Sequence, residues 1–137
     1  NRVGSAEIDD GLQLLDCRIT NAVKCLPPAN KPLTSEVHTC NAYLVSEIAQ
    51  FRPRAILALG VIAHGAVLRA LRLRASDFRF AHGARHRLVL QGATDGMTSC
   101  LFDSYHCSRY NTQTKRLTTD MFTEIFRNIR EFLGAAA

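Results

Sequence analysis

A five-residue apolar run, Ala55–Leu59, constrains the fold more than any other part of the chain. It contains no polar residue, which is typical of a strand that is buried on both faces of a parallel sheet. Gly60 follows directly, and residues 61–71 then have the composition and length of a helix. Because parallel strands need a crossover connection, usually a helix, the chain is expected to contain βαβ units.

The preceding segments begin this alternation of strands and helices. Asp16–Val23 is rich in β-branched residues and predicts a first strand, which stops at a proline-rich turn over residues 27–32. Apolar residues then recur at helical spacing up to Pro53, and Thr34 is placed to cap the start of that helix. The helix-spaced apolar residues are Val37, Cys40, Leu44 and Ile48.

The later segments supply two more strands and a final helix. Apolar runs at residues 88–90 and 100–102 flank a turn with glycine at both ends and predict a pair of strands. A helix is expected from about Asp120 to Leu133, with Thr119 near its start. Its predicted core stripe is Phe122, Ile125, Phe126, Ile129 and Leu133. This order predicts an α/β fold, a three-layer αβα sandwich with a central, mainly parallel four-stranded sheet.

The composition fits one globular domain, or part of one. Of 137 residues, 47% are hydrophobic and 21% are charged, which argues against disordered and fibrous chains. No apolar run approaches the roughly 18 residues that a membrane span needs. Five irregularly spaced cysteines favour reduced thiols or metal ligands in a cytoplasmic protein over a secreted disulfide scaffold. Lys and Arg outnumber Asp and Glu by 17 to 12, which is compatible with a polyanionic partner.

A polar segment, Asp103–Thr114, follows the last predicted strand. It combines a histidine, hydroxyls, amides, an arginine and a tyrosine at the carboxyl end of that strand, where open α/β sheets place their sites. Basic and aromatic side chains in one loop suit phosphate contacts and insertion between stacked bases. The alternative is a surface loop with a capping histidine.

Two cysteines, Cys25 and Cys40, are separated by 14 residues. This is not the paired spacing of a zinc ribbon, but two such thiolates can supply half of a four-cysteine iron–sulfur site. The alternative is two buried, inert thiols. The segment Gly60–Gly65 lacks the dinucleotide-binding fingerprint, and His64 within it is expected to be structural.

Four segments together resemble the uracil-DNA glycosylase superfamily, and within it the iron–sulfur-containing bacterial and archaeal family 5, the B type. These segments are Ile19–Pro32, Ala58–Gly60, His82–Ala84 and Ser104–Thr114, the last continued by Arg116-Leu117-Thr118. The resemblance covers about residues 11–133. The family most often has proline where Cys107 stands here, which leaves this loop somewhat less rigid.

The resemblance implies a role for each site residue. Asn21 resembles the asparagine that reads uracil, since its amide can donate to a carbonyl and accept from the ring N–H, a pattern that cytosine does not match. His106 resembles the histidine that donates to the uracil oxygen on which charge gathers. Ser108, Arg109, Tyr110 and Asn111 are expected to bind DNA, with Tyr110 in the place of the intercalating side chain.

The resemblance also implies what lies outside this chain. Cys25 and Cys40 are expected to hold a 4Fe-4S cluster with two upstream cysteines. The catalytic acid is also expected upstream, because no residue here matches it. Asn1–Ser5 shows neither an initiator methionine nor a signal peptide, so residues 1–137 are expected to be the carboxyl-terminal portion of a single glycosylase domain.

The implied function is base-excision repair. We expect a monomeric enzyme that hydrolyses the N-glycosidic bond of uracil, and of other deaminated bases, in the DNA of a bacterial or archaeal cytoplasm, associated with the nucleoid. The alternative is a non-catalytic nucleic-acid-binding module that is derived from the same fold.

Overall fold

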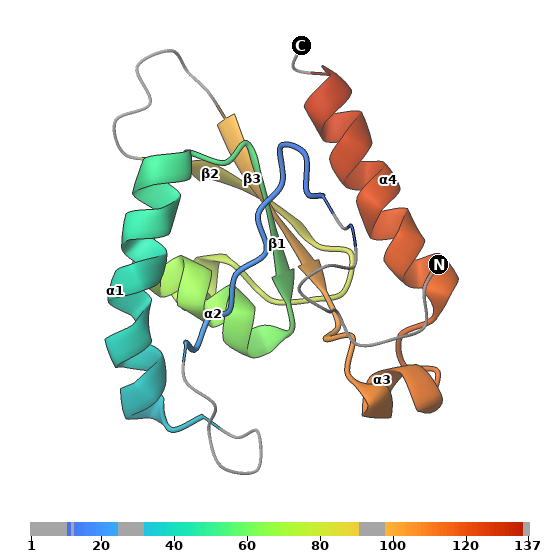
Figure 1. The fold of residues 1–137 in the computed structure, drawn as a ribbon, viewed down its shortest axis with the longest axis horizontal. Coiled ribbons are helices and arrows are strands. Elements are labelled where there is room, and N and C mark those ends of the chain that lie inside the picture. The colour runs from blue at the N-terminus through green and yellow to red at the C-terminus, as the bar shows by residue number, and fades with distance from the viewer. Residues whose placement is uncertain (1–10, 12, 25–31, 91–97, 136–137) are drawn as a thin grey trace.

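The computed structural model describes residues 11, 13–24, 32–90 and 98–135. Within them, a helix, a strand and a second helix come first, and two strands followed by two helices come after (Figure 1). The strands are β1 (Ala55–Leu59), β2 (Arg85–Val89) and β3 (Thr98–Ser104). The helices are α1 (Thr34–Phe51), α2 (Val61–Ala70), α3 (Arg109–Gln113) and α4 (Thr119–Ala135), with a 3₁₀ turn at Ala75–Asp77.

The described strands form one mixed sheet in the order β1-β3-β2. β1 runs parallel to β3, with Leu59 opposite Ser104 at the end of both strands. β2 runs antiparallel to β3, with Arg85 opposite Phe102. The α/β class is confirmed. Over the described residues, however, the sheet has three strands with one parallel pair, whereas four mainly parallel strands were predicted.

The largest difference between the prediction and the structure is at the predicted first strand. Residues 16–23 form bends and irregular chain, and they pair with none of the three strands. A strand is stable only where a neighbour accepts and donates its backbone hydrogen bonds, and the described part of the chain offers this segment no such neighbour. Its Arg18 and Thr20 side chains bond instead to Glu47 of α1.

Helices cover both faces of the sheet, as the αβα layering predicts. In Figure 1, α1 and α2 lie on one side and α4 on the other. Leu101 of β3 packs in the core that α1 and α2 cover, whereas Cys100 and Phe102 pack with Ile125 of α4. This alternation follows from the two-residue period of a strand. Burial of one such side chain stabilises the fold by about 1.5–3 kcal/mol.

The ends of the helices and their buried residues differ in detail from the prediction. Leu33, not Thr34, is the residue that caps α1, and its N–H donates to the Glu36 carboxylate at 2.7 Å. Arg52 ends α1 in the left-handed region, at φ 42°. The following Pro53 disfavours right-handed helical geometry at Arg52, which explains why the helix stops here. On α4, Ile125 is buried but Phe126 is 46% exposed, so the predicted core stripe is only partly core.

None of the helices in the described part of the chain has the length and apolar character that crossing a bilayer requires.

Candidate functional site

The carboxyl ends of β1 and β3 meet at one edge of the sheet. The Gly60 N–H donates to the carbonyl of Ser104 at 2.8 Å, which joins the end of one strand to the end of the other. Gly60 has φ +94° and ψ 167°, a region that only glycine occupies without strain. A Cβ at this position would lie 3.2 Å from the Cβ of His106. The glycine therefore lets the His106 loop approach the start of α2 closely.

The loop after β3 is closed by the short helix α3, which the sequence did not reveal. The Ser108 hydroxyl accepts the N–H of Asn111 at 3.4 Å and caps this helix. The Asn111 side-chain amide donates to the His106 carbonyl at 2.8 Å. These two bonds fix the backbone on both sides of Cys107, so the loop has a defined shape although its residues are largely polar.

Three predicted site residues are exposed at this edge. His106, Arg109 and Tyr110 all face solvent, and Tyr110 is 70% exposed on the first turn of α3. An exposed imidazole, a guanidinium and an aromatic ring thus lie within five residues of one another along the chain. This set can donate protons, contact phosphate and stack on a planar group.

The His82–Ala84 motif lies against the same loop. The Tyr105 ring stacks on the His82 ring, with centroids 4.9 Å apart and planes 23° apart. The Arg116 guanidinium lies 4.9 Å from the centroid of the Tyr105 ring, within the range of a cation–π contact. His82 and Tyr105, which are 23 residues apart in sequence, are therefore in direct contact beside His106.

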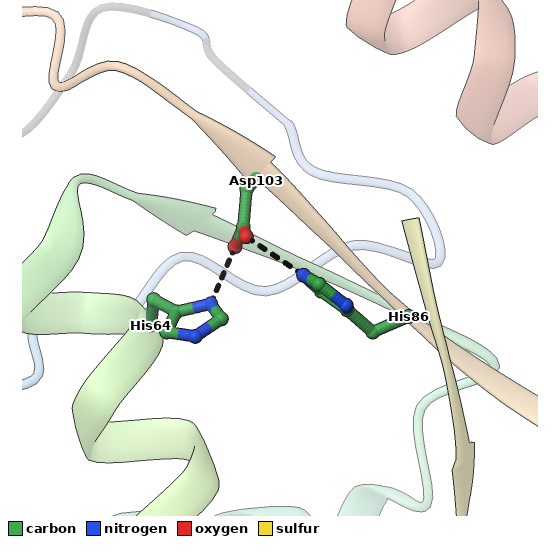
Figure 2. Close-up of side chains that lie close together, drawn as sticks. All are labelled: His64, His86 and Asp103. Atoms are coloured by element: carbon green, nitrogen blue, oxygen red, sulfur yellow. Dashed lines mark hydrogen bonds and ion pairs between the residues drawn. The ribbon is translucent and has the colours of Figure 1, made fainter. Parts of the chain in front are cut away.

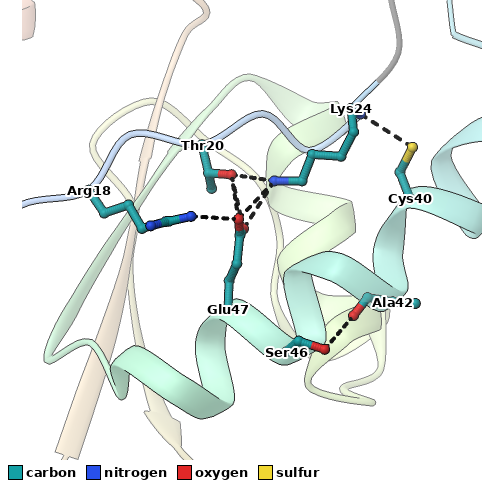
Figure 3. Close-up of polar contacts among 7 residues, drawn as sticks. All are labelled: Arg18, Thr20, Lys24, Cys40, Ala42, Ser46 and Glu47. Atoms are coloured by element: carbon teal, nitrogen blue, oxygen red, sulfur yellow. Dashed lines mark hydrogen bonds and ion pairs between the residues drawn. The ribbon is translucent and has the colours of Figure 1, made fainter.

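The segment that carries Asn21 is held on α1 by a cluster of charges (Figure 3). The Glu47 carboxylate accepts from Arg18 at 3.2 Å, from Thr20 at 2.9 Å and from the Lys24 ammonium at 3.1 Å; Lys24 also donates to the Thr20 hydroxyl. Partial burial acts to raise the pKa of Glu47. The hydrogen bonds from Lys24, Thr20 and Arg18, together with the Lys24 charge, outweigh it and hold that pKa below its usual value.

Asn21 itself lies exposed between Thr20 and Lys24. The chain is thus bonded to Glu47 of α1 on both sides of Asn21, and Asn21 itself is exposed.

The two predicted cluster ligands are tested only in part. Cys25 lies outside the described residues, whereas Cys40 is buried on α1. The backbone N–H of Lys24 donates to the Cys40 sulfur at 3.3 Å, which places the residue before Cys25 at that thiol. Cys100 is also buried, and burial raises the pKa of its thiol, while Cys17 and Cys107 are exposed.

A buried polar cluster lies behind the site, and sequence reasoning missed it (Figure 2). Asp103 of β3 is fully buried; one carboxylate oxygen lies 2.8 Å from His64 Nδ1 of α2 and the other lies 3.0 Å from His86 Nε2 of β2. The expectation that His64 is structural agrees with this position. A polar residue inside the buried run of β3 was the one available signal, since buried carboxylates need partners.

The proton positions in this cluster follow from its partners. His64 Nε2 lies 2.9 Å from the Phe78 carbonyl, which can only accept, so this nitrogen carries a hydrogen. The other ring nitrogen, His64 Nδ1, faces the Asp103 oxygen at 2.8 Å. The ligand atoms of His64, His86 and Asp103 lie within 4.8 Å of one another, as metal ligands can, but hydrogen bonds already account for them.

Two shallow grooves in the described part of the chain lie away from these groups. One is lined by Arg52, Leu71 and Val89 where α1, α2 and β2 end, and the other by Thr34 and Val61 at the starts of α1 and α2. Neither of these two grooves is lined by His106 or Asn21, and the candidate site is marked by the loop after β3.

Comparison with known proteins agrees with the resemblance of the motifs. The sequence model of the uracil-DNA glycosylase superfamily matches residues 4–130. The type-5 uracil-DNA glycosylase of Pyrobaculum aerophilum is 39% identical over 127 residues, which are 93% of this chain and 52% of that protein. The type-5 enzyme of Thermus thermophilus is 39% identical over 91% of this chain and 54% of its own length.

A type-4 uracil-DNA glycosylase of Pyrobaculum aerophilum is 36% identical over 70% of this chain and 47% of its own length. The chain thus spans about half the length of the curated relatives that it matches.

Proposed function

The chain belongs to the uracil-DNA glycosylase superfamily, and we propose that the protein containing it is a DNA glycosylase of base-excision repair. It would hydrolyse the N-glycosidic bond of uracil, and of other deaminated bases, to release the free base and leave an abasic site. The observation that carries this proposal is the exposed His106, which is held at the joined ends of β1 and β3 against a glycine that gives it room.

His106 and Asn21 would both contact the uracil base, with different roles. A glycosylase must extrude the nucleotide from the duplex and read the base in a pocket. The His106 imidazole would donate to the uracil oxygen on which negative charge develops as the bond breaks. The exposed amide of Asn21 would pair with the uracil carbonyl and ring N–H. The catalytic acid is proposed to lie in the part of the protein that precedes this chain.

The residues around α3 would bind the DNA strand. Arg109 is exposed and would contact phosphate, and the 70% exposed Tyr110 would fill the gap left in the base stack. Ser108 accepts a bond from the backbone, so its hydroxyl hydrogen remains to donate to phosphate. The Asn111 side-chain amide donates to the His106 carbonyl, and its side-chain oxygen remains as an acceptor.

Cys25 and Cys40 would be two of the four ligands of a 4Fe-4S cluster. The fit is supported by the buried Cys40 thiol, by its N–H···S bond from Lys24, and by the position of Cys25 one residue further along the chain. Backbone N–H groups commonly donate to cluster thiolates. When bound, the cluster would tie the Asn21 segment to α1; bond hydrolysis needs no electron transfer.

The wider organisation is also a proposal. Residues 1–137 would be the carboxyl-terminal portion of one domain, a three-layer αβα sandwich whose complete central sheet would have four mainly parallel strands. We propose that the protein works as a monomer on nucleoid DNA in the cytoplasm of a bacterial or archaeal cell.

The test is single-turnover excision by the full-length protein. Duplexes that contain one uracil are incubated with excess enzyme, and free uracil and abasic sites are quantified. We expect release of uracil from these duplexes and no base release from undamaged control duplexes. The rate should be at least about a hundredfold lower in His106→Ala, because removal of an oxyanion donor has about this effect. Binding of the variant to an abasic duplex should be nearly unchanged, since this hydrogen bond strengthens mainly in the transition state.

A full-length protein that binds such duplexes tightly but releases no base would contradict the enzymatic proposal and favour a non-catalytic binding module.

A further inference from the structure

The His82–Ala84 motif is a turn that is bonded directly to β3. The Gly83 N–H donates to the Asp103 carbonyl at 2.9 Å, and the Asp103 N–H donates to the Ala84 carbonyl at 3.0 Å. Gly83 has φ +82°, in the region that favours glycine, so the tight turn depends on this residue. The motif therefore has a fixed position relative to the strand that leads into the His106 loop.

The His82 ring contacts the residue that precedes His106 in two ways. The backbone N–H of Tyr105 donates to His82 Nδ1 at 3.2 Å, and the two rings stack. The nearby Ser104 hydroxyl donates to the Tyr105 carbonyl at 3.0 Å, which leaves His82 Nδ1 as the acceptor for the Tyr105 N–H. The backbone one residue before His106 is thus held on both its N–H and its carbonyl.

This contact requires a neutral imidazole. Burial lowers the pKa of His82 from its usual value of 6.5, which keeps Nδ1 unprotonated and able to accept. A protonated ring would have hydrogens on both nitrogens, and Nδ1 would then repel the Tyr105 N–H. The groups that face this stack are the Ser104 hydroxyl, the Tyr105 phenol and the Arg116 guanidinium.

We propose that His82 is a positioning residue for His106, acting through the backbone N–H and the ring of Tyr105. The proposal rests on the proposed function, since the geometry that it protects is that of the uracil-contacting imidazole. Removal of the acceptor would leave the Tyr105 N–H without its partner and let the loop shift. Small displacements of a reacting group lower rates strongly, by up to about a hundredfold for 1 Å.

Two variants of the full-length protein separate the acceptor from the ring. In His82→Asn, the side-chain oxygen takes the place of Nδ1 and can accept from Tyr105 but cannot titrate. In His82→Phe, the stack is kept and the acceptor is lost. His38→Phe is the matched control, because His38 is an exposed residue on α1. Single-turnover excision is measured from about pH 5 to 8, beside binding to an abasic duplex.

We expect His82→Phe to lower the excision rate by about tenfold or more near pH 7.5, with binding within about twofold of wild type. His82→Asn should recover most of that rate, and the fall in rate at acid pH should become shallower by one proton. If both His82 variants had the excision rate and the pH profile of the wild-type protein, the proposal would be overturned.

A second measurement does not depend on activity. The Tyr105 amide proton is followed by NMR in the full-length protein over the same pH range. A downfield resonance that moves upfield at acid pH in wild type, but is independent of pH in His82→Asn, supports the contact. A wild-type protein that releases no uracil but shows this titration refutes the proposed function alone; a Tyr105 amide that is insensitive to both variants refutes the positioning contact.

Discussion

At the scale of single residues, Gly60 and His106 show how one backbone conformation controls a site. The glycine has φ +94°, and its missing Cβ leaves room for the Cβ of His106. The site therefore depends on the absence of a Cβ atom at Gly60 as well as on the His106 side chain.

The first prediction concerns Gly60→Ala. Because φ is strained for any other residue and the new Cβ would lie 3.2 Å from His106, we expect a loss of about 1–3 kcal/mol in stability and a lower excision rate. Gly65→Ala on α2 is the control, since nothing lies within 4 Å of the place that its new methyl group would take and alanine favours helix by about 0.5–1 kcal/mol. Urea unfolding and single-turnover rates check both, and equal effects of the two variants would contradict the prediction.

At the scale of elements, buried and surface polar clusters join segments in different ways. Asp103 joins β3 to α2 and β2 through two histidines in the interior. Glu47 joins the Asn21 segment to α1 near the surface, where water screens the charges. The same kinds of groups should therefore differ in energy because their burial differs.

The second prediction compares two changes at Asp103. In Asp103→Asn, the amide can donate to His64 Nδ1 and accept from His86 Nε2, so the loss in stability should stay below about 1 kcal/mol. Asp103→Leu leaves both ring nitrogens without partners and should lose about 2–5 kcal/mol. Urea denaturation of the full-length protein at neutral pH measures the difference. Similar losses in the two variants would show that hydrogen bonding is not what the carboxylate provides.

The third prediction is a pH dependence at Glu47. Since the folded pKa lies below the usual value of 4.5, the carboxylate stabilises the fold above that pH, and this contribution is lost as the pH falls through the folded pKa. Glu47→Gln should thus be less stable than wild type near pH 7, by less than about 1 kcal/mol, with a smaller difference near pH 4 and at high salt. Glu124→Gln, in an exposed pair with Arg127, is the control. A difference that grows on acidification would contradict this sign.

At the scale of the whole molecule, one sheet separates two cores and carries the site at one edge. The core under α1 and α2 contains Leu44 and Leu101, and the core under α4 contains Phe102 and Ile125. The segment with Asn21 lies over α1, with Ala22 packed against the first core. The proposed 4Fe-4S cluster would add a second attachment of this segment to α1, through Cys25 and Cys40.

The fourth prediction concerns that cluster. Full-length protein purified anaerobically should be brown and contain about four iron atoms per chain, and Cys40→Ser should lose most of the iron. Cys17→Ser, which changes an exposed thiol, should keep it. Iron analysis and visible absorbance provide the measurement. Colourless, iron-free wild-type protein would leave Cys40 as a buried, inert thiol.

The sequence by itself determined the elements whose patterns are local. The strand at 55–59 and the helices that begin near residues 34, 61 and 119 follow from apolar runs and helical spacing, which need no knowledge of distant residues. The position of His106 after a buried strand followed from the same kind of pattern.

Only the tertiary structure decided the antiparallel pairing of β2 with β3, the irregular course of residues 16–23, and the partners of Asp103 and His82. Strand direction and pairing depend on which backbone lies alongside. The contacts of His64 with Asp103 and of His82 with Tyr105 join residues 39 and 23 positions apart. Such contacts arise from packing across elements, and a periodic pattern within one segment contains no information about them.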